Sequence, residues 1–120
     1  MWAVPTVTDD LQDLGALDPE EILDYYDGPI LFTTRDRQGN LLLAYLCGAS
    51  GSMQRFLVIP ISPAQLTDLR QGRVSLRNAL IGQGWTWLVD LEGSGEVLNL
   101  SQIDPTTLPR DALPQPEAYL

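Results

Sequence analysis

Residues 54–72 read QRFLVIPISPAQLTDLRQG, an apolar run followed directly by the signals that begin a helix. Positions 56–59 are all apolar, so the run does not alternate as a half-exposed strand does. A short apolar run without alternation is typical of a strand that is buried on both faces. We therefore expect a strand over residues 54–61 that lies in the middle of a sheet.

The second half of this stretch predicts a helix. Ser62 is a good N-cap, Pro63 suits the first helical position, and Gln65 stands where a capping box needs it. Gly72 is a natural residue to follow the last turn. The sequence thus predicts a helix over residues 63–71, directly after the central strand.

Similar signals outside this stretch predict the other elements. Asp18, Pro19 and Glu21 repeat the pattern of cap, proline and capping-box residue, which favours a short helix over residues 19–26. Alternating or apolar runs between glycine-rich and polar turns predict strands. These strands are expected over residues 29–35, 41–48, 84–91 and 96–100, with a second short helix over 76–81. The predicted fold is α+β: a mostly antiparallel sheet of about five strands, with short helices packed on one face.

Length and composition are those of a single domain. The chain has 120 residues, of which 44% are hydrophobic, and a chain of this size can bury a stable core without metal ions or disulfides. We expect an acidic arm over residues 1–17, one α+β domain over 18–104 and a proline-rich tail over 105–120.

The chain contains neither an apolar run of about 20 residues nor a basic, apolar export signal, so a cytoplasmic location is expected.

Missing residue types exclude several chemistries. The chain has no histidine, no lysine and one cysteine, Cys47. Histidine-dependent triads, zinc–histidine sites, Schiff bases and internal disulfides are therefore excluded for this chain alone. We assign no catalytic residue, no metal site and no cofactor. Carboxylates, arginines and aromatic rings remain as the groups available for function.

The negative charge is concentrated near the N-terminus. The net charge is −9, and residues 1–27 account for −8 of it because they contain eight acidic residues and no basic one. This charge disfavours binding to nucleic acid or to an anionic membrane. It can instead steer the chain toward a basic protein, although a merely solvated acidic surface remains the alternative.

Two groups of side chains are candidates for binding. Trp85 and Trp87 are two residues apart on a predicted strand, so both point to the same face, as core residues or as a binding platform. The candidate partner-binding residues are these two tryptophans and six acidic residues: Asp9, Asp10, Asp13, Glu20, Glu21 and Asp24. Arg35, Arg37 and Arg55 form a candidate anion-binding patch, with ordinary exposed arginines as the alternative.

Three short segments carry a family resemblance. YDGPILF at 26–32, LVIPIS at 57–62 and GRVSLR at 72–77 occur in an order that resembles an uncharacterised bacterial family of small proteins of unknown function. The resemblance extends over about residues 24–90. It implies a bacterial or phage origin, and it implies no activity and no role for any residue.

The sequence thus favours a small, acidic, cytoplasmic protein-binding module without catalysis. A basic protein is the expected partner, as for an antitoxin, an immunity protein or an inhibitor, and a homodimer formed through an open sheet edge is compatible with this function. The alternative is a small hydrolase or small-ligand-binding protein that uses carboxylates and arginines. That alternative requires a cleft in which an acidic group and an arginine meet.

Overall fold

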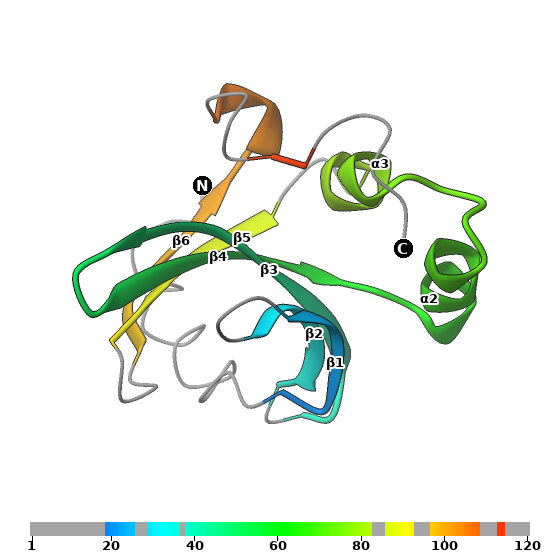
Figure 1. Cartoon of the computed structure of the whole chain (residues 1–120), viewed down its shortest axis with the longest axis horizontal. Helices are drawn as coiled ribbons and strands as arrows, with labels where there is room; N and C mark the ends of the chain where they lie inside the picture. The colour runs from blue at the N-terminus through cyan, green and yellow to red at the C-terminus, as the bar shows by residue number, and fades with distance from the viewer. Residues whose placement is uncertain are drawn as a thin grey trace.

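A computed structural model describes residues 19–25, 29–36, 38–82, 86–92, 97–108 and 113–114. Within these residues the chain forms one antiparallel sheet of six strands, with two short helices between the fourth and fifth strands (Figure 1). The spatial order of the strands equals their order in the chain, so the sheet is a meander. The strands are β1 (Glu21–Tyr25), β2 (Pro29–Arg35), β3 (Leu41–Ser50), β4 (Met53–Pro60), β5 (Thr86–Leu91) and β6 (Val97–Ile103).

The helix expected over residues 19–26 is wrong, because this segment forms strand β1. Glu21 and Ile22 pair with Thr33 and Phe32 of β2, and the amide of Glu20 donates to the carbonyl of Thr33 over 2.7 Å. An isolated helix of about eight residues is only marginally stable, whereas pairing satisfies the backbone of β2 on its outer side. The additional strand also corrects the expected five strands to six.

The prediction for the central strand is confirmed. β4 lies between β3 and β5, and its residues Phe56, Leu57, Val58 and Ile59 are at most 3% exposed. Successive residues point to opposite faces of the sheet, so β4 contributes to two core clusters. The first cluster contains Phe32, Leu42, Ala44, Phe56, Val58, Val89, Leu91 and Leu100. The second contains Leu31, Leu43, Ile59, Ile61, Leu69 and Leu80.

The two helices begin at the predicted residues. α2 (Pro63–Arg70) has a complete capping box: the amide of Gln65 donates to Ser62 Oγ over 3.0 Å, and the amide of Ser62 donates to Gln65 Oε1 over 2.8 Å. α3 (Leu76–Ile81) is capped by Ser75 in the same position. A short 3-10 helix, η1 (Pro105–Thr107), follows β6.

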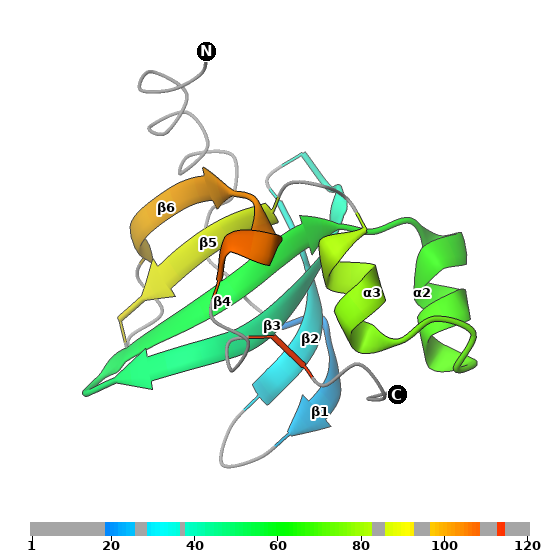
Figure 2. The same cartoon turned by 90° about the horizontal axis from the view of Figure 1, so that it is seen from above.

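The expectation that the helices pack on one face of the sheet is only partly met. α2 and α3 lie side by side beyond the end of β4 and do not spread across the sheet (Figure 2). Leu69 of α2 and Leu80 of α3 complete the second core cluster there. The helices thus close one end of the sheet because Pro60 and the capped Ser62 direct the chain from β4 straight into α2.

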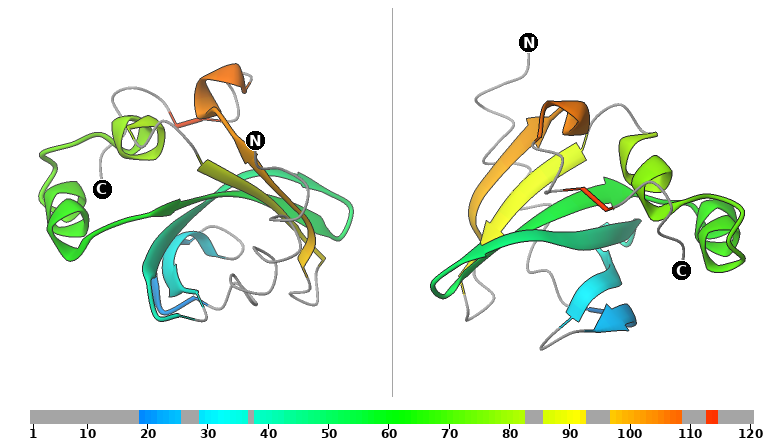
Figure 3. Two further views of the ribbon diagram at one scale, coloured as in Figure 1. Left: turned by 180° about the vertical axis from the view of Figure 1, so that it is seen from behind. Right: turned by 45° about the horizontal axis from the view of Figure 1, so that its top comes forward.

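The sheet is strongly twisted. β1 and β2 run across the direction of β5 and β6 when the sheet is seen from above or tilted forward (Figures 2 and 3). A two-residue turn joins β3 to β4, and it requires Gly51, whose φ is +61°. Such tight turns with positive φ match the right-handed twist of the strands that they connect. β1 and β6 are the two outer strands of the described sheet, because they stand at the two ends of the strand order.

Candidate functional site

An open hollow lies at the end of the β2–β3 hairpin, beside the start of α2. Its volume is about 450 Å³, within the range of about 300–1,000 Å³ common for ligand sites. We call it the Trp87 hollow, and Asp36 is the charged residue among the described residues that line it. The lining residues are Asp36, Asn40, Leu41, Leu42, Pro60, Ile61, Ser62, Gln65 and Trp87.

Asp36 is held as a carboxylate at the rim of this hollow. Its Oδ1 accepts hydrogen bonds from the amides of Gln38 and Asn40, both over 2.9 Å, and its Oδ2 accepts one from Asn40 Nδ2 over 3.0 Å. Burial acts to raise the pKa of Asp36, but the hydrogen bonds from Asn40, Gln38 and Gly39 outweigh it and lower the pKa below the usual 3.8. The hollow therefore carries a negative charge at neutral pH.

Trp87 forms the aromatic wall of the hollow. It pairs with Val58 across β4 and β5, is half-buried and packs against the first core cluster. The part of the Trp87 side chain that is not buried in the core borders the hollow. Trp87 is thus both a core residue and an accessible aromatic surface. Trp85, its predicted companion, lies outside the described residues.

The described acidic candidates lie at the β1 edge, where Glu20 and Glu21 each bind an arginine. Glu20 Oε2 accepts a hydrogen bond from Arg35 Nε over 2.7 Å, and Glu21 forms an ion pair with Arg70 of α2. The side chains of Glu20 and Glu21 are about half exposed, so these pairs add little stability. Asp24 is exposed on the same strand. Asp9, Asp10 and Asp13 lie outside the described residues.

The candidate arginines do not meet in the part of the chain that the structure describes. Arg35 pairs with Leu41 and Arg55 with Gly48, seven residues apart on β3, a distance of about 23 Å at the rise of a strand. Each arginine binds a different carboxylate, Glu20 or Asp90. Arg37 lies outside the described residues.

The Arg55–Asp90 pair joins β4 to β5. Arg55 Nε donates to Asp90 Oδ1 over 2.7 Å, and Nη2 donates to Oδ2 over 3.1 Å. The two residues are direct cross-strand neighbours. Because the Asp90 side chain is only 8% exposed, this two-point contact supplies the partner that a buried carboxylate needs. The contact also favours the strand register in which Arg55 and Asp90 lie opposite each other.

Cys47 lies beside this pair and is half-buried. Burial raises the pKa of its thiol to about 11, although the nearby Arg55 acts in the opposite direction. The thiolate is the reactive form of cysteine, and at neutral pH little of it forms here. Cys47 is thus a half-buried thiol of low reactivity.

Labelling should show this directly. At pH 8, Cys47 in the folded chain is expected to react with iodoacetamide at least about tenfold more slowly than a thiol with the ordinary pKa of 9.0, because the raised pKa leaves much less thiolate. The rate should rise with pH up to about 11. Mass spectrometry of the alkylated protein measures it, and the chain unfolded in guanidinium is the control. Equal rates in the folded and unfolded chain at pH 8 would contradict this environment.

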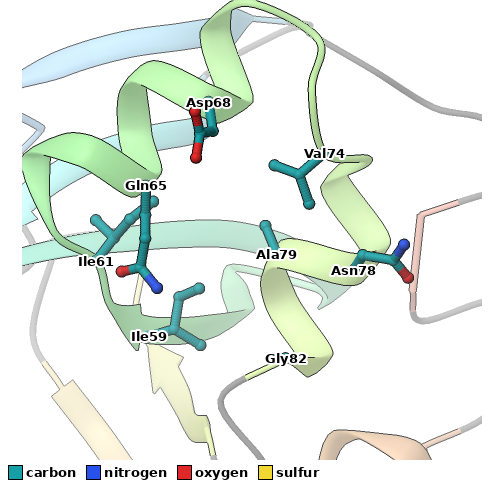
Figure 4. A pocket seen from close by; sticks show the side chains of 8 residues that line it. All are labelled: Ile59, Ile61, Gln65, Asp68, Val74, Asn78, Ala79 and Gly82. Carbon is teal, nitrogen blue, oxygen red and sulfur yellow. The ribbon is translucent and has the colours of Figure 1, made fainter.

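A second, smaller cavity of about 230 Å³ lies between α2 and α3. Figure 4 shows Asp68, Val74 and Ala79 pointing into the space between the helices, whereas Asn78 points away from it. Asp68 Oδ1 accepts a hydrogen bond from Arg73 Nη1 over 2.9 Å. An acidic group and an arginine thus meet at this cavity, although both are exposed to solvent.

Asp36 is the site residue that sequence reasoning missed. Its signal is the segment Asp36-Arg37-Gln38-Gly39-Asn40, in which an aspartate precedes a glycine-containing turn. An aspartate in this position commonly accepts hydrogen bonds from the amides that follow it. The turn itself was expected, but its position beside Trp87 depends on pairing that is distant in the sequence.

The described residues thus define a small α+β domain built on an antiparallel meander, with an acidic, aromatic hollow at one end. No helix among the described residues is long and apolar enough to cross a membrane. The chain belongs to a family of unknown function (DUF6575), whose family model matches residues 10–93. This confirms the resemblance to an uncharacterised family. No curated protein and no solved structure matches the chain.

Proposed function

We propose that this chain is a small protein-binding module of the bacterial cytoplasm that binds a basic protein partner, as an antitoxin, an immunity protein or an inhibitor does. The observation that carries the proposal is the Trp87 hollow, where an ionised Asp36 and an aromatic ring border one opening. No arginine is among the described residues that line it. A cationic side chain of the partner is the group that fits such a hollow best.

An arginine of the partner would make two favourable contacts in the hollow. Its guanidinium can donate a hydrogen bond to the Asp36 carboxylate, and such charge-assisted bonds are stronger than neutral ones. Its planar face can also lie on the indole of Trp87, a cation–π contact that contributes about 0.5–2 kcal/mol. Leu42 and Pro60 supply apolar walls for the aliphatic part of the side chain.

The charge of the whole chain supports the same partner. A net charge of −9 attracts a basic protein over a distance of about 10 Å at moderate salt, which raises the association rate. The pairs of Glu20 with Arg35 and of Glu21 with Arg70 leave these carboxylates about half exposed and therefore open to a second cation. The hollow thus provides a specific contact within a generally attractive field.

A short peptide tests the hollow. We expect acetyl-Gly-Arg-Gly amide to shift the NMR signal of the Trp87 indole N–H. The Kd should be about 1–10 mM, because the peptide makes one charged contact and one cation–π contact. In the Asp36→Asn variant the affinity should fall at least about fivefold, because the amide oxygen keeps the bonds from the backbone amides of Gln38 and Asn40, whereas the charge and the bond from Asn40 Nδ2 are lost. Binding should also weaken as the pH falls through the lowered pKa of Asp36, below 3.8.

The controls separate this contact from general attraction. Asp68→Asn removes one exposed carboxylate at the other cavity and should leave the Trp87 shift unchanged. Acetyl-Gly-Glu-Gly amide should give no shift. If Asp36→Asn binds the arginine peptide as tightly as the parent chain does, the hollow is not the binding site.

The α2–α3 cavity favours a second candidate function, the binding of a small polar ligand. Its apolar wall is formed by Ile59, Ile61, Val74 and Ala79. Asp68, with Arg73 beside it, supplies the carboxylate and arginine that this alternative requires. Its volume of about 230 Å³ is below the usual range for such sites, so we place this function second.

A further inference from the structure

The two outer strands of the described sheet differ in charge. β1 carries Glu21 and Asp24, and Glu20 directly precedes it. β6 reads VLNLSQI and contains no charged residue, no proline and no glycine. Natural proteins commonly protect an outer strand with charges, proline or bulges, because its unpaired backbone groups can bind another strand. β1 has charges within the strand. β6 has neither charge nor proline, and the irregularity in its pairing with β5 is confined to Leu98, which leaves residues 99–103 regularly paired.

The exposed side chains of β6 are those of an accessible strand. Leu98 is 42% exposed, a high value for a large apolar residue, and Asn99 and Ser101 are also exposed. Leu100 points into the first core cluster, whereas Leu98, the extra residue at the irregularity in the pairing with β5, does not share its face. Every second residue of an outer strand directs its backbone N–H and C=O away from the sheet. No strand among the described residues pairs with the outer side of β6, so this side offers backbone hydrogen bonds together with one apolar contact.

We infer that β6 pairs antiparallel with β6 of a second copy of this chain, joining two six-stranded sheets about a two-fold axis. In the register that places Ser101 opposite Ser101 of the second copy, the regularly paired residues 99–103 of β6 face only uncharged residues of the same strand. The same pairing at β1 would bring Glu21 and Asp24 close to their own copies, and like charges across strands are destabilising. The second copy is therefore the occupant that fits β6 and not β1.

The flanking residues define the limits of this interface. Glu96 and Asp104 directly precede and follow β6 in the sequence, so repulsion confines the pairing to the neutral segment between them. A single pair of seven-residue strands is smaller than a standard interface of about 1,600 Å². The dimer is therefore weak and forms at high protein concentration.

Salt distinguishes this interface from the binding of a basic partner. Each copy carries a net charge of −9, so two copies repel each other, and salt screens this repulsion. Dimerisation strengthens as the ionic strength rises, whereas attraction between the acidic chain and a basic protein weakens. The dimer and the Trp87 hollow use different residues, so either proposal stands if the other fails.

Sedimentation equilibrium of the full chain tests the inference. We expect a monomer–dimer equilibrium whose dissociation constant decreases between about 50 mM and about 500 mM NaCl. Ser101→Lys should raise this constant at least about tenfold, because two lysines meet at the paired strands. Gln38→Lys adds the same charge at an exposed turn and should change the constant little. Circular dichroism confirms that each variant is folded.

Mixing two variants gives the decisive result. Ser101→Lys and Ser101→Asp should each remain monomeric alone and associate when mixed, because opposite charges then face each other across the two strands. Hydrogen exchange should also become slower at the β6 amides as protein concentration rises, and this readout needs no substitution. A chain that stays monomeric at high concentration and high salt, or a Ser101→Lys variant that dimerises like the parent chain, would overturn the inference.

Discussion

Replacing Phe56 with alanine should lower the free energy of unfolding by about 3–5 kcal/mol. Phe56 is 3% exposed in the central strand β4, between Leu46 of β3 and Val89 of β5. Its ring meets that of Phe32 edge-on, with centroids 5.4 Å apart and planes at 70°. The substitution removes apolar burial, leaves a cavity in the first core cluster and abolishes this aromatic contact.

Urea denaturation measures the loss, at a protein concentration low enough to keep the chain monomeric. Because a domain of this size is stable by only about 5–15 kcal/mol, the midpoint should move to a much lower urea concentration. Ile22→Ala is the matched control, since Ile22 is 47% exposed and should cost less than about 1 kcal/mol. Similar losses in the two variants would show that Phe56 is not a core residue.

Replacing Arg55 with alanine should cost about 2 kcal/mol, more than the Asp90→Asn substitution in the same pair. Arg55→Ala leaves a carboxylate of 8% exposure without its partner, and breaking a fully buried pair costs about 3–5 kcal/mol. We discount this figure because the Arg55 side chain is 45% exposed and solvent screens the pair. Asp90→Asn removes the buried charge itself and returns Arg55 to water, at a cost of about 1 kcal/mol.

A double-mutant cycle over Arg55 and Asp90 separates the contact from the cost of the unpaired carboxylate. Arg73→Ala is the matched control, because its pair with Asp68 is exposed on both sides and should contribute less than about 1 kcal/mol. Urea titrations measure the free energy of unfolding of the parent chain, the two single variants and the double variant. If Asp90→Asn costs more than Arg55→Ala, burial of the carboxylate is not what makes this pair important.

Local sequence signals predicted the elements whose stability is local. α2 begins at Pro63 as expected because both hydrogen bonds of its capping box lie within four residues of the chain. β4 was placed correctly in the middle of the sheet because its apolar run needs cover on both faces. The similar signal at Asp18 and Pro19 failed, because pairing of Ile22 with Phe32 outweighed a weak helical preference.

The site was less predictable than the fold. Trp87 was chosen for its residue type, but Asp36 joins it only because β3, β4 and β5 place the β2–β3 turn near the start of β5. In the same way, Arg35 of β2 and Arg55 of β4 both flank β3, but they pair with Leu41 and Gly48, which are seven residues apart along that strand. Register decides which charged groups meet, and register depends on long-range packing.

The meander order of the strands has a consequence for how the chain folds. Four of the five strand pairs join neighbours through short connections, so most contacts form between residues close in the sequence. The exception is β4 with β5, where Gln54 pairs with Leu91 and the helices α2 and α3 lie in between. Because closing a longer loop costs more entropy, docking of the β5–β6 hairpin onto β4 is the step expected to limit the folding rate.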